Sequence, residues 1–156
     1  MAKARKKAAK KTKKPSRKVS REPKTFSQQL GIKEGEMVVC LHCKEQFITR
    51  LRSQLPPYAR LFQTVQDDKA PDVVIRFFNE HADFDASFRW LEKRLNPGGC
   101  IWGVIIKKSA LRVGQRDLRN DMAAAAKRAG MVETRNVPFS AVEYGIKFVR
   151  RQVRNS

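Results

Sequence analysis

The chain has 156 residues, of which 41% are hydrophobic, and a formal net charge of +19 at pH 7. This length predicts one domain with a tail, because most domains contain about 100–150 residues. No apolar stretch is long enough to cross a bilayer, and the basic N-terminus lacks the apolar segment of a secretory signal. These features argue against a membrane or secreted protein and predict a cytoplasmic one.

The positive charge lies at the two ends of the chain. Residues 1–24 contain twelve Lys or Arg and one Glu, residues 25–106 contain ten side chains of each sign, and residues 107–156 contain twelve basic and four acidic ones. Residues 1–24 have no aromatic side chain and almost no apolar one larger than Ala. They cannot bury enough surface to offset their ordering entropy, so we predict a disordered, lysine-rich arm. Residues 25–156 form the predicted domain.

Apolar runs of strand length mark the expected sheet. A short helical or turn segment at 26–35 comes before the first of them. Continuous apolar runs are expected of strands that are buried on both faces. The expected strands are 37–41, a weaker one within 58–62, 72–78, 100–106, 131–137 and 142–150. Only residues 138–141 join the last two, which is too short for a parallel crossover, so this pair must be antiparallel.

Between the strands, apolar residues recur at helical spacing. The three sets are Phe47, Leu51 and Leu55; then Phe84, Phe88, Leu91 and Leu95; then Leu118, Met122, Ala125, Ala126 and Ala129. Pro56-Pro57, the Asn96–Gly99 turn and Gly130 mark the helix ends. Strands that alternate with amphipathic helices predict a three-layer α/β sandwich, with a mainly parallel sheet closed by an antiparallel C-terminal strand pair.

Two local motifs add a resemblance to this order of elements. Leu95–Ile101 reads Leu-Asn-Pro-Gly-Gly-Cys-Ile, and Ala129–Val132 reads Ala-Gly-Met-Val. The first resembles the Leu-x-Pro-Gly-Gly turn before strand five of class I S-adenosylmethionine-dependent methyltransferases, and the second resembles the turn before their strand six. The resemblance covers roughly residues 30–150 and implies a methyltransferase-like Rossmann fold.

A more specific resemblance is to a bacterial family of short methyltransferase-like proteins, the domain of unknown function number three thousand fifty-two. The pieces that carry it are Leu30–Gly35, Leu55-Pro56, Pro97–Trp102, Lys107–Ser109, Gly130–Glu133 and Tyr144–Arg151. This chain departs from the family in Ile105-Ile106, where a Trp-Pro-like pair is expected, and in Tyr144, where Trp is usual. The resemblance implies a fold and no established activity.

The residues argue against a cofactor site. Rossmann-type folds use glycines after the first strand to make a tight turn and to let the backbone approach the ligand. Residues 41–47 contain no glycine, and Asp67 and Asp68 lie too far beyond the weak strand to hold ribose hydroxyls. We therefore predict a degenerate fold with no cofactor and no catalytic residues.

Cysteine and histidine give no strong metal or catalytic pattern. Cys40-Leu41-His42-Cys43 is a Cys-x-x-Cys motif, but a structural zinc site needs four ligands, and the only other candidates are Cys100 and His81. A buried Cys40 with an incidental Cys43 is the favoured interpretation, and a redox role stays open. No metal site is predicted.

Two other clusters have structural interpretations. Glu80, Asp83 and Asp85 are expected to serve the start of the following helix, whose dipole favours negative charge there. The aromatic residues of 77–102 have the spacing of core residues, with Trp90 as the exception.

The basic ends predict a polyanionic partner, namely nucleic acid bound without sequence preference. The predicted contacts are Lys3, Arg5, Lys6, Lys7, Lys10, Lys11, Lys13, Lys14, Arg17 and Lys18 in the arm, and Lys107, Lys108, Arg150 and Arg151 in the C-terminal third. Association with the nucleoid and an unidentified protein partner for the folded domain stay open. The alternatives are a divergent S-adenosylmethionine-dependent methyltransferase that acts near nucleic acid or ribosomes, or a tether to ribosomes or an acidic protein. Acidic lipid is disfavoured, because the arm has no apolar anchor.

Overall fold

The computed structural model describes residues 24–152 and contains one six-stranded sheet in the order β2-β1-β3-β4-β6-β5. The strands are β1 (Met37–Leu41), β2 (Arg60–Phe62), β3 (Val73–Phe77), β4 (Cys100–Ile106), β5 (Met131–Pro138) and β6 (Glu143–Arg150). Strands β1 to β4 run parallel, and β6 is antiparallel to both β4 and β5. The predicted fold class is therefore confirmed. The predicted arm lies outside the described residues, apart from Lys24.

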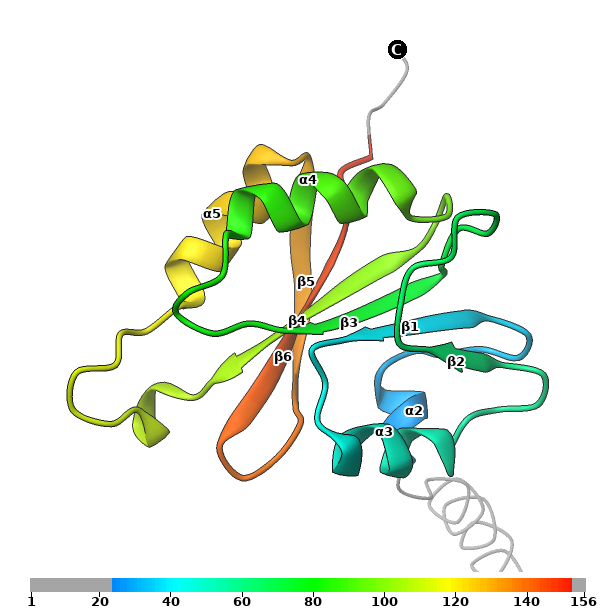
Figure 1. The fold of residues 1–156 in the computed structure, drawn as a ribbon, viewed down its shortest axis with the longest axis horizontal. Coiled ribbons are helices and arrows are strands. Elements are labelled where there is room, and N and C mark those ends of the chain that lie inside the picture. Colours follow the sequence, from blue (N-terminus) through cyan, green and yellow to red (C-terminus); the bar gives the residue numbers. More distant parts are fainter. Residues whose placement is uncertain (1–23, 153–156) are drawn as a thin grey trace, which may run out of the picture.

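Helices cover both faces of the sheet (Figure 1). The helices are α2 (Phe26–Gln29), α3 (Glu45–Arg52), α4 (Phe84–Arg94) and α5 (Arg119–Arg128), with a 3-10 turn at Lys108–Ala110. Helices α2 and α3 pack on one face, and α4 and α5 pack on the other. Leu55 lies beyond the end of α3, although its spacing placed it on that helix. Pro56 explains the difference, since a proline disfavours helical backbone in the residue before it.

Alternate residues of the central strands face two separate cores. Val39 and Val74 face the core under α4 and α5, which contains Phe88 and Phe148. Their neighbours along the strands face the core under α2 and α3, and Trp102 is fully buried at its centre. The indole N–H of Trp102 donates to the carbonyl oxygen of Leu30 at 3.2 Å. Burial on both faces explains why these strands read as continuous apolar runs.

The connection from β2 to β3 contains no helix. Residues 63–72 carry the chain past β1 as a loop with several bends, and Val65 of this loop packs against the core under α4 and α5. Parallel crossovers usually contain a helix. Without one, part of the face of β1 beside α4 has no helix above it.

One edge strand of the sheet, β2, is short, and the other, β5, is irregular. Strand β2 has three residues, and β5 has a register shift between Glu133 and Arg135 in its pairing with β6. Residues 133–136 of β5 are exposed and polar. Within residues 24–152 no helix has the length and apolar character needed to cross a membrane.

Asp83 begins α4, as predicted from its position. Its carboxylate accepts a hydrogen bond from the backbone N–H of Ala86 at 3.0 Å. Asp85 forms an ion pair with Arg128 of α5 at 2.7 Å, which holds the pKa of Asp85 below its ordinary value. Two of the three clustered acids therefore serve the start of α4 or its contact with α5.

We expect the Asp83→Ala variant to lose about 1 kcal/mol of unfolding free energy, because one backbone donor at the start of α4 loses its acceptor. Asp67→Ala is the matched control, since Asp67 is exposed and its side chain makes no hydrogen bond or ion pair with another described residue. Urea denaturation followed by circular dichroism measures both variants. Equal losses in the two variants would contradict this role of Asp83.

Candidate functional site

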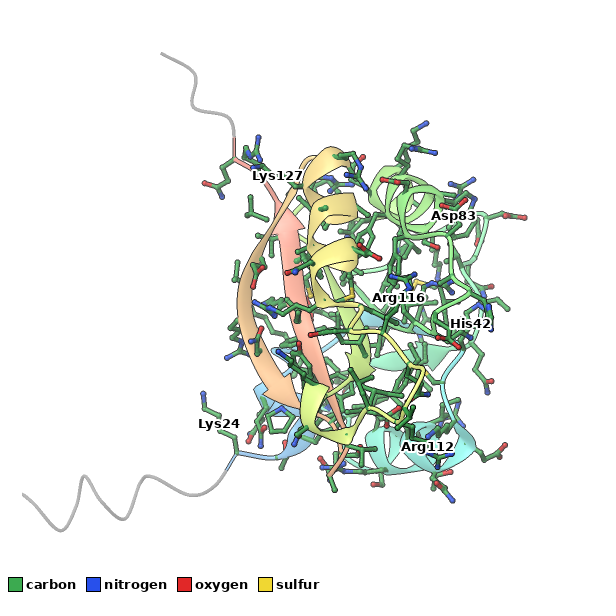
Figure 2. The ribbon with its side chains drawn as sticks, turned by 90° about the vertical axis from the view of Figure 1, so that its left-hand side faces the viewer. Lys24, His42, Asp83, Arg112, Arg116 and Lys127 are labelled. Carbon is green, nitrogen blue, oxygen red and sulfur yellow. The ribbon has the colours of Figure 1, made fainter. Side chains whose placement is uncertain are left out.

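The carboxyl ends of the parallel strands β1 to β4 lie along one edge of the fold. In an open α/β sheet, ligands bind beyond these ends where the strand order reverses, which here is between β1 and β3. After β1 the chain turns through His42, Cys43 and Lys44 into α3 (Figure 2). His42 has φ 58°, the left-handed conformation that glycine usually supplies. The turn therefore forms without glycine and presents an exposed imidazole.

The residues around this turn do not fit the S-adenosylmethionine that the fold class implies. The side chain of His42 stands where a glycine would let the backbone approach a ligand. Residues Gln63 and Thr64 follow β2, while Asp67 and Asp68 lie exposed further along the loop. No carboxylate therefore ends β2 to hold ribose hydroxyls.

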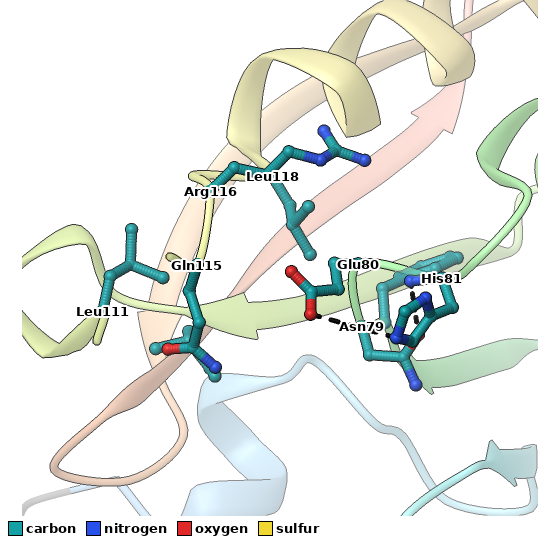
Figure 3. A pocket seen from close by; sticks show the side chains of 9 residues that line it. Asn79, Glu80, His81, Leu111, Gln115, Arg116 and Leu118 are labelled. Atoms are coloured by element: carbon teal, nitrogen blue, oxygen red, sulfur yellow. Dashed lines mark hydrogen bonds and ion pairs between the residues drawn. The ribbon is translucent and has the colours of Figure 1, made fainter. Parts of the chain in front are cut away.

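A small pocket lies at the carboxyl ends of β3 and β4 (Figure 3). Its volume is about 140 Å³, whereas small-molecule sites usually have roughly 300–1,000 Å³. Its apolar floor is formed by Phe78, Ile106, Leu111 and Leu118, and its polar lining residues are Asn79, Glu80, His81, Gln115 and Arg116. None of these lining residues has a hydroxyl or thiol that could act as a nucleophile. The pocket suits a small apolar group better than a nucleoside.

The polar groups of this pocket already have partners within the fold. His81 lies 3.9 Å from the carboxylate of Glu80, and its backbone N–H donates to the side-chain oxygen of Asn79 at 2.9 Å. Arg116 forms an ion pair with Asp121 of α5. These contacts join residues of the loops around the pocket, and Glu80 and His81 are the acid–base pair among its lining residues.

The two cysteines of the Cys-x-x-Cys motif are free thiols, one buried and one half-buried. Cys40 is buried, and the thiol of Cys43 is directed at the carbonyl oxygens of Leu41 and Ile75, at 3.5 and 3.7 Å. A hydrogen bond with Cys40, together with burial, raises the pKa of Cys43 far above its usual range. Burial also raises the pKa of Cys100 to about 11. Reactive cysteines have lowered pKa values, whereas the pKa values of Cys43 and Cys100 are raised. Residues 24–152 contain no cluster of three or more His, Cys, Asp or Glu that could hold a metal ion.

Many arginines of the C-terminal third form ion pairs with carboxylates of the domain. The pairs are Arg116–Asp121, Arg119–Glu133 at 3.0 Å, Arg128–Asp85 at 2.7 Å and Arg150–Glu92 at 2.6 Å. Lys107, Lys108 and Arg112, in and beside the 3-10 turn after β4, form no ion pair within residues 24–152. Arg112 and Lys127 lie at opposite ends of the molecule in Figure 2. The basic residues of this third are therefore spread out and partly neutralised.

Arg150 differs from the three other C-terminal contacts that the sequence predicted. Its guanidinium pairs with Glu92 and also donates to the carbonyl oxygens of Leu95 at 2.8 Å and Asn96 at 3.2 Å. These carbonyls lie at the C-terminal end of α4, where helices leave acceptors without partners. Arg150 therefore has a structural role in joining β6 to α4, while Lys107, Lys108 and Arg151 have no such contact within the described chain.

No family model and no curated protein sequence matches this chain. Its fold does match solved structures. Fibrillarin from Aeropyrum pernix, solved with bound S-adenosyl-L-methionine, is 14% identical over 79% of this chain and 72% of its own, with a TM-score of 0.53. A putative type 11 methyltransferase from Sulfolobus solfataricus is 10% identical over 84% and 92%, with a TM-score of 0.52. The mitomycin 7-O-methyltransferase MmcR is 10% identical with a TM-score of 0.58, and this chain, matched over 80% of its length, spans about half (52%) of that protein.

These likenesses and the strand order define the fold of the chain. The chain has the α/β Rossmann-like fold of class I S-adenosylmethionine-dependent methyltransferases, reduced to six strands. At 10–14% identity the likeness establishes the fold alone.

Sequence reasoning missed Arg76 of β3. Strand residues alternate between faces, so Arg76 faces the same side as Val74 and Phe78, which are both buried. A cation at an apolar position of a central strand is informative, because charged residues are rarely buried without a partner. The alternation of strand residues between the two faces of the sheet, applied to residues 72–78, could have identified Arg76 from the sequence.

We expect the Arg150→Met variant to lose about 2 kcal/mol of unfolding free energy, because Glu92 and the last carbonyls of α4 lose a charged donor. The control is Arg151→Met, which removes the same charge from an exposed side chain and should change stability by less than about 0.5 kcal/mol. Thermal and urea unfolding measure both. Loss of duplex binding by Arg150→Met, with stability unchanged, would contradict the structural role and support the predicted nucleic-acid contact of Arg150.

Proposed function

We propose that this chain is a noncatalytic methyltransferase-like protein that binds nucleic acid without sequence preference through the basic residues of its N-terminal 24 positions. The observation that carries the proposal is the charge distribution. Residues 1–24 have a net charge of +11, while residues 25–106, which form most of the sheet, are neutral. Lysines attract phosphates and release their counterions, which favours binding whatever the base sequence.

Within the domain, we assign a supporting role in this binding to Lys107, Lys108 and Arg151. Lys108 and Arg151 are exposed, and none of the three forms an ion pair within the described chain. Phosphate contacts of this kind position a protein on the duplex but do not read base edges. The folded domain would then contact a protein partner, and the arm would localise the protein to the nucleoid.

We also propose that the chain belongs to the bacterial domain-of-unknown-function family that its motifs resemble. The structure gives two of those motifs a physical role that supports the proposal. The Pro97–Trp102 segment begins β4, where an added Cβ at Gly99 would come within 2.8 Å of the carbonyl oxygen of Asp72. Gly130 has φ 85° and makes the turn from α5 into β5.

The second candidate function is that of a divergent methyltransferase that acts near nucleic acid. The fold favours it, since the matched structure of fibrillarin contains S-adenosyl-L-methionine. The glycine-free turn at His42 and the lack of a carboxylate directly after β2 argue against it. Direct cofactor binding therefore distinguishes the two candidates.

If binding depends on counterion release, log affinity falls linearly with log salt, with a slope of about −0.9 per phosphate contacted on duplex DNA. We expect that changing the ten predicted arm residues (Lys3 to Lys18) to Gln removes most of the affinity and reduces the slope by about five, which corresponds to half of them acting at once. Lys107→Gln with Lys108→Gln should have a smaller effect. The control, Arg128→Gln, removes an ion-paired cation of α5 and should change neither quantity appreciably.

Fluorescence anisotropy across a salt series, with random and fixed-sequence duplexes as competitors, measures these quantities. Unchanged binding by the arm variant would refute the arm as the contact surface. A strong preference for one duplex sequence would refute the mechanism, because lysines outside a groove-reading element cannot supply it.

We expect no saturable binding of S-adenosylmethionine or S-adenosylhomocysteine by isothermal titration calorimetry. The physical reason is that the side chain of His42 lies at the turn after β1, where the backbone would have to approach the cofactor. The double variant His42→Gly with Lys44→Gly removes two bulky side chains from this turn and tests whether they exclude the cofactor. Micromolar binding by the unmodified chain would favour the methyltransferase candidate.

A further inference from the structure

Arg76 is a half-buried cation in the middle of the sheet. It pairs with Leu41 of β1 on one side and with Gly103 of β4 on the other, so no strand edge is near it. Its guanidinium lies 4.6 Å from the centre of the Phe78 ring, on the face that α4 covers. The main chain thus holds this charge among apolar side chains.

The guanidinium of Arg76 has no anionic partner within residues 24–152. Its Nε is buried and makes no hydrogen bond there, and no described carboxylate forms an ion pair with it. Burial lowers the pKa of Arg76, and no neighbouring acid opposes that effect. Arg76 is half-buried and its Nε reaches neither solvent nor a described acceptor, so an anion bound beside it would supply the missing partner. By contrast, Arg128 of α5 and Arg150 of β6 each form an ion pair with a carboxylate.

A pocket of about 350 Å³ opens beside Arg76, between β1, β3 and α4. The pocket exists because the β2–β3 crossover contains no helix. Helix α4 therefore flanks the pocket on one side, and no second helix of the described chain flanks it on the other. The lining residues that matter are Leu41, His42, Arg76, Ser87, Trp90 and Leu91. Its volume lies within the usual range for small-molecule sites, roughly 300–1,000 Å³. It is separate from the pocket at the ends of β3 and β4, which has no lining residue in common with it.

The polar lining groups of this pocket are all able to donate hydrogen bonds. They are the guanidinium of Arg76 from β3, the imidazole of His42 from the turn after β1, and the hydroxyl of Ser87 from α4. No carboxylate lines the pocket. Donors from three separate elements suit a tetrahedral oxyanion, such as a phosphate, better than a planar one, such as a carboxylate. A tetrahedral group presents oxygens in more directions. Trp90, which is 44% exposed, and Leu91 supply an apolar wall.

We propose that this pocket binds a small molecule that carries a phosphate monoester on an apolar or aromatic body, with Arg76 holding the phosphate and Trp90 contacting the body. This site is independent of the basic arm. It differs from a phosphate contact on the protein surface because its cation is held within the sheet, where the charge is worth more than in water.

Phenyl phosphate is a suitable probe, because it combines the two required chemical features in a compact molecule. The experiment uses the full chain, freed of nucleic acid and in phosphate-free buffer. The chain has two tryptophans, and Trp102 is fully buried beneath α2 and α3. The indole N–H signals of a ¹⁵N-labelled sample therefore report on the pocket (Trp90) and on the opposite core (Trp102). A Trp90→Phe variant assigns them.

We expect a saturable shift of the Trp90 signal with phenyl phosphate and no shift of the Trp102 signal. Phenol, which lacks the anion, should give no saturable shift, and benzoate should bind more weakly than phenyl phosphate. Arg76→Met should weaken phenyl phosphate binding by about tenfold or more. The control Arg89→Met removes an exposed arginine of α4 that does not line the pocket, and this variant should bind like the unmodified chain.

Stability supplies an independent measurement. Without ligand, Arg76→Met should be as stable as the unmodified chain or more stable, since a half-buried charge with no described ionic partner is removed. Phenyl phosphate should raise the Tm of the unmodified chain and not that of Arg76→Met. The proposal is overturned if the Trp90 signal does not move, if Arg76→Met and the unmodified chain respond alike, or if benzoate binds as tightly as phenyl phosphate. Loss of duplex binding by the arm variant would leave all of these results unchanged.

Discussion

The burial of both faces of β1, β3 and β4 is the constraint on which the rest of the structure depends. Apolar side chains on each face must be removed from water, which contributes roughly 25 cal/mol per Å² of buried apolar surface. Helices α2 and α3 meet this need on one face, and α4 and α5 meet it on the other. The large side chains at the two centres, Trp102 and Phe148, show how each core is filled from a different strand. Only beside α4, where the β2–β3 crossover has no helix, is this covering incomplete.

Features that depend on local periodicity could be predicted from the sequence. The stripe of Phe84, Phe88 and Leu91 identified α4, and the glycine at position 130 marked the end of α5. The 3-10 turn at Lys108–Ala110 was not predicted, because so short an element has no repeating pattern. The ion pair between Arg150 and Glu92 joins residues that are far apart in the sequence, so only the assembled sheet reveals it. The same reason hid the surroundings of Arg76, although its place within an apolar run was visible.

Net charge and functional charge are different quantities in this chain. Residues 107–156 have a net charge of +8, yet four of their arginines form ion pairs with carboxylates of the domain. Two of these carboxylates, Asp85 and Glu92, belong to α4, so two arginines of the C-terminal third are paired with carboxylates of an earlier segment of the chain. The residues that remain for an external polyanion are fewer and more widely spaced than composition alone indicates. Arg76 is the opposite case, because it lies in the neutral segment and has no described partner.

The irregular edges of the sheet limit how a protein partner could attach. Many domains recruit extended peptides by adding a strand to an open edge, where backbone hydrogen bonds supply most of the affinity. Here β2 offers only three residues, and the bulge and charged side chains of β5 disturb the row of backbone groups that an added strand would need. The same features oppose self-association into extended sheets. A protein partner of this domain would therefore be recognised through side chains and pockets, where specificity is set by shape and charge instead of by the peptide backbone.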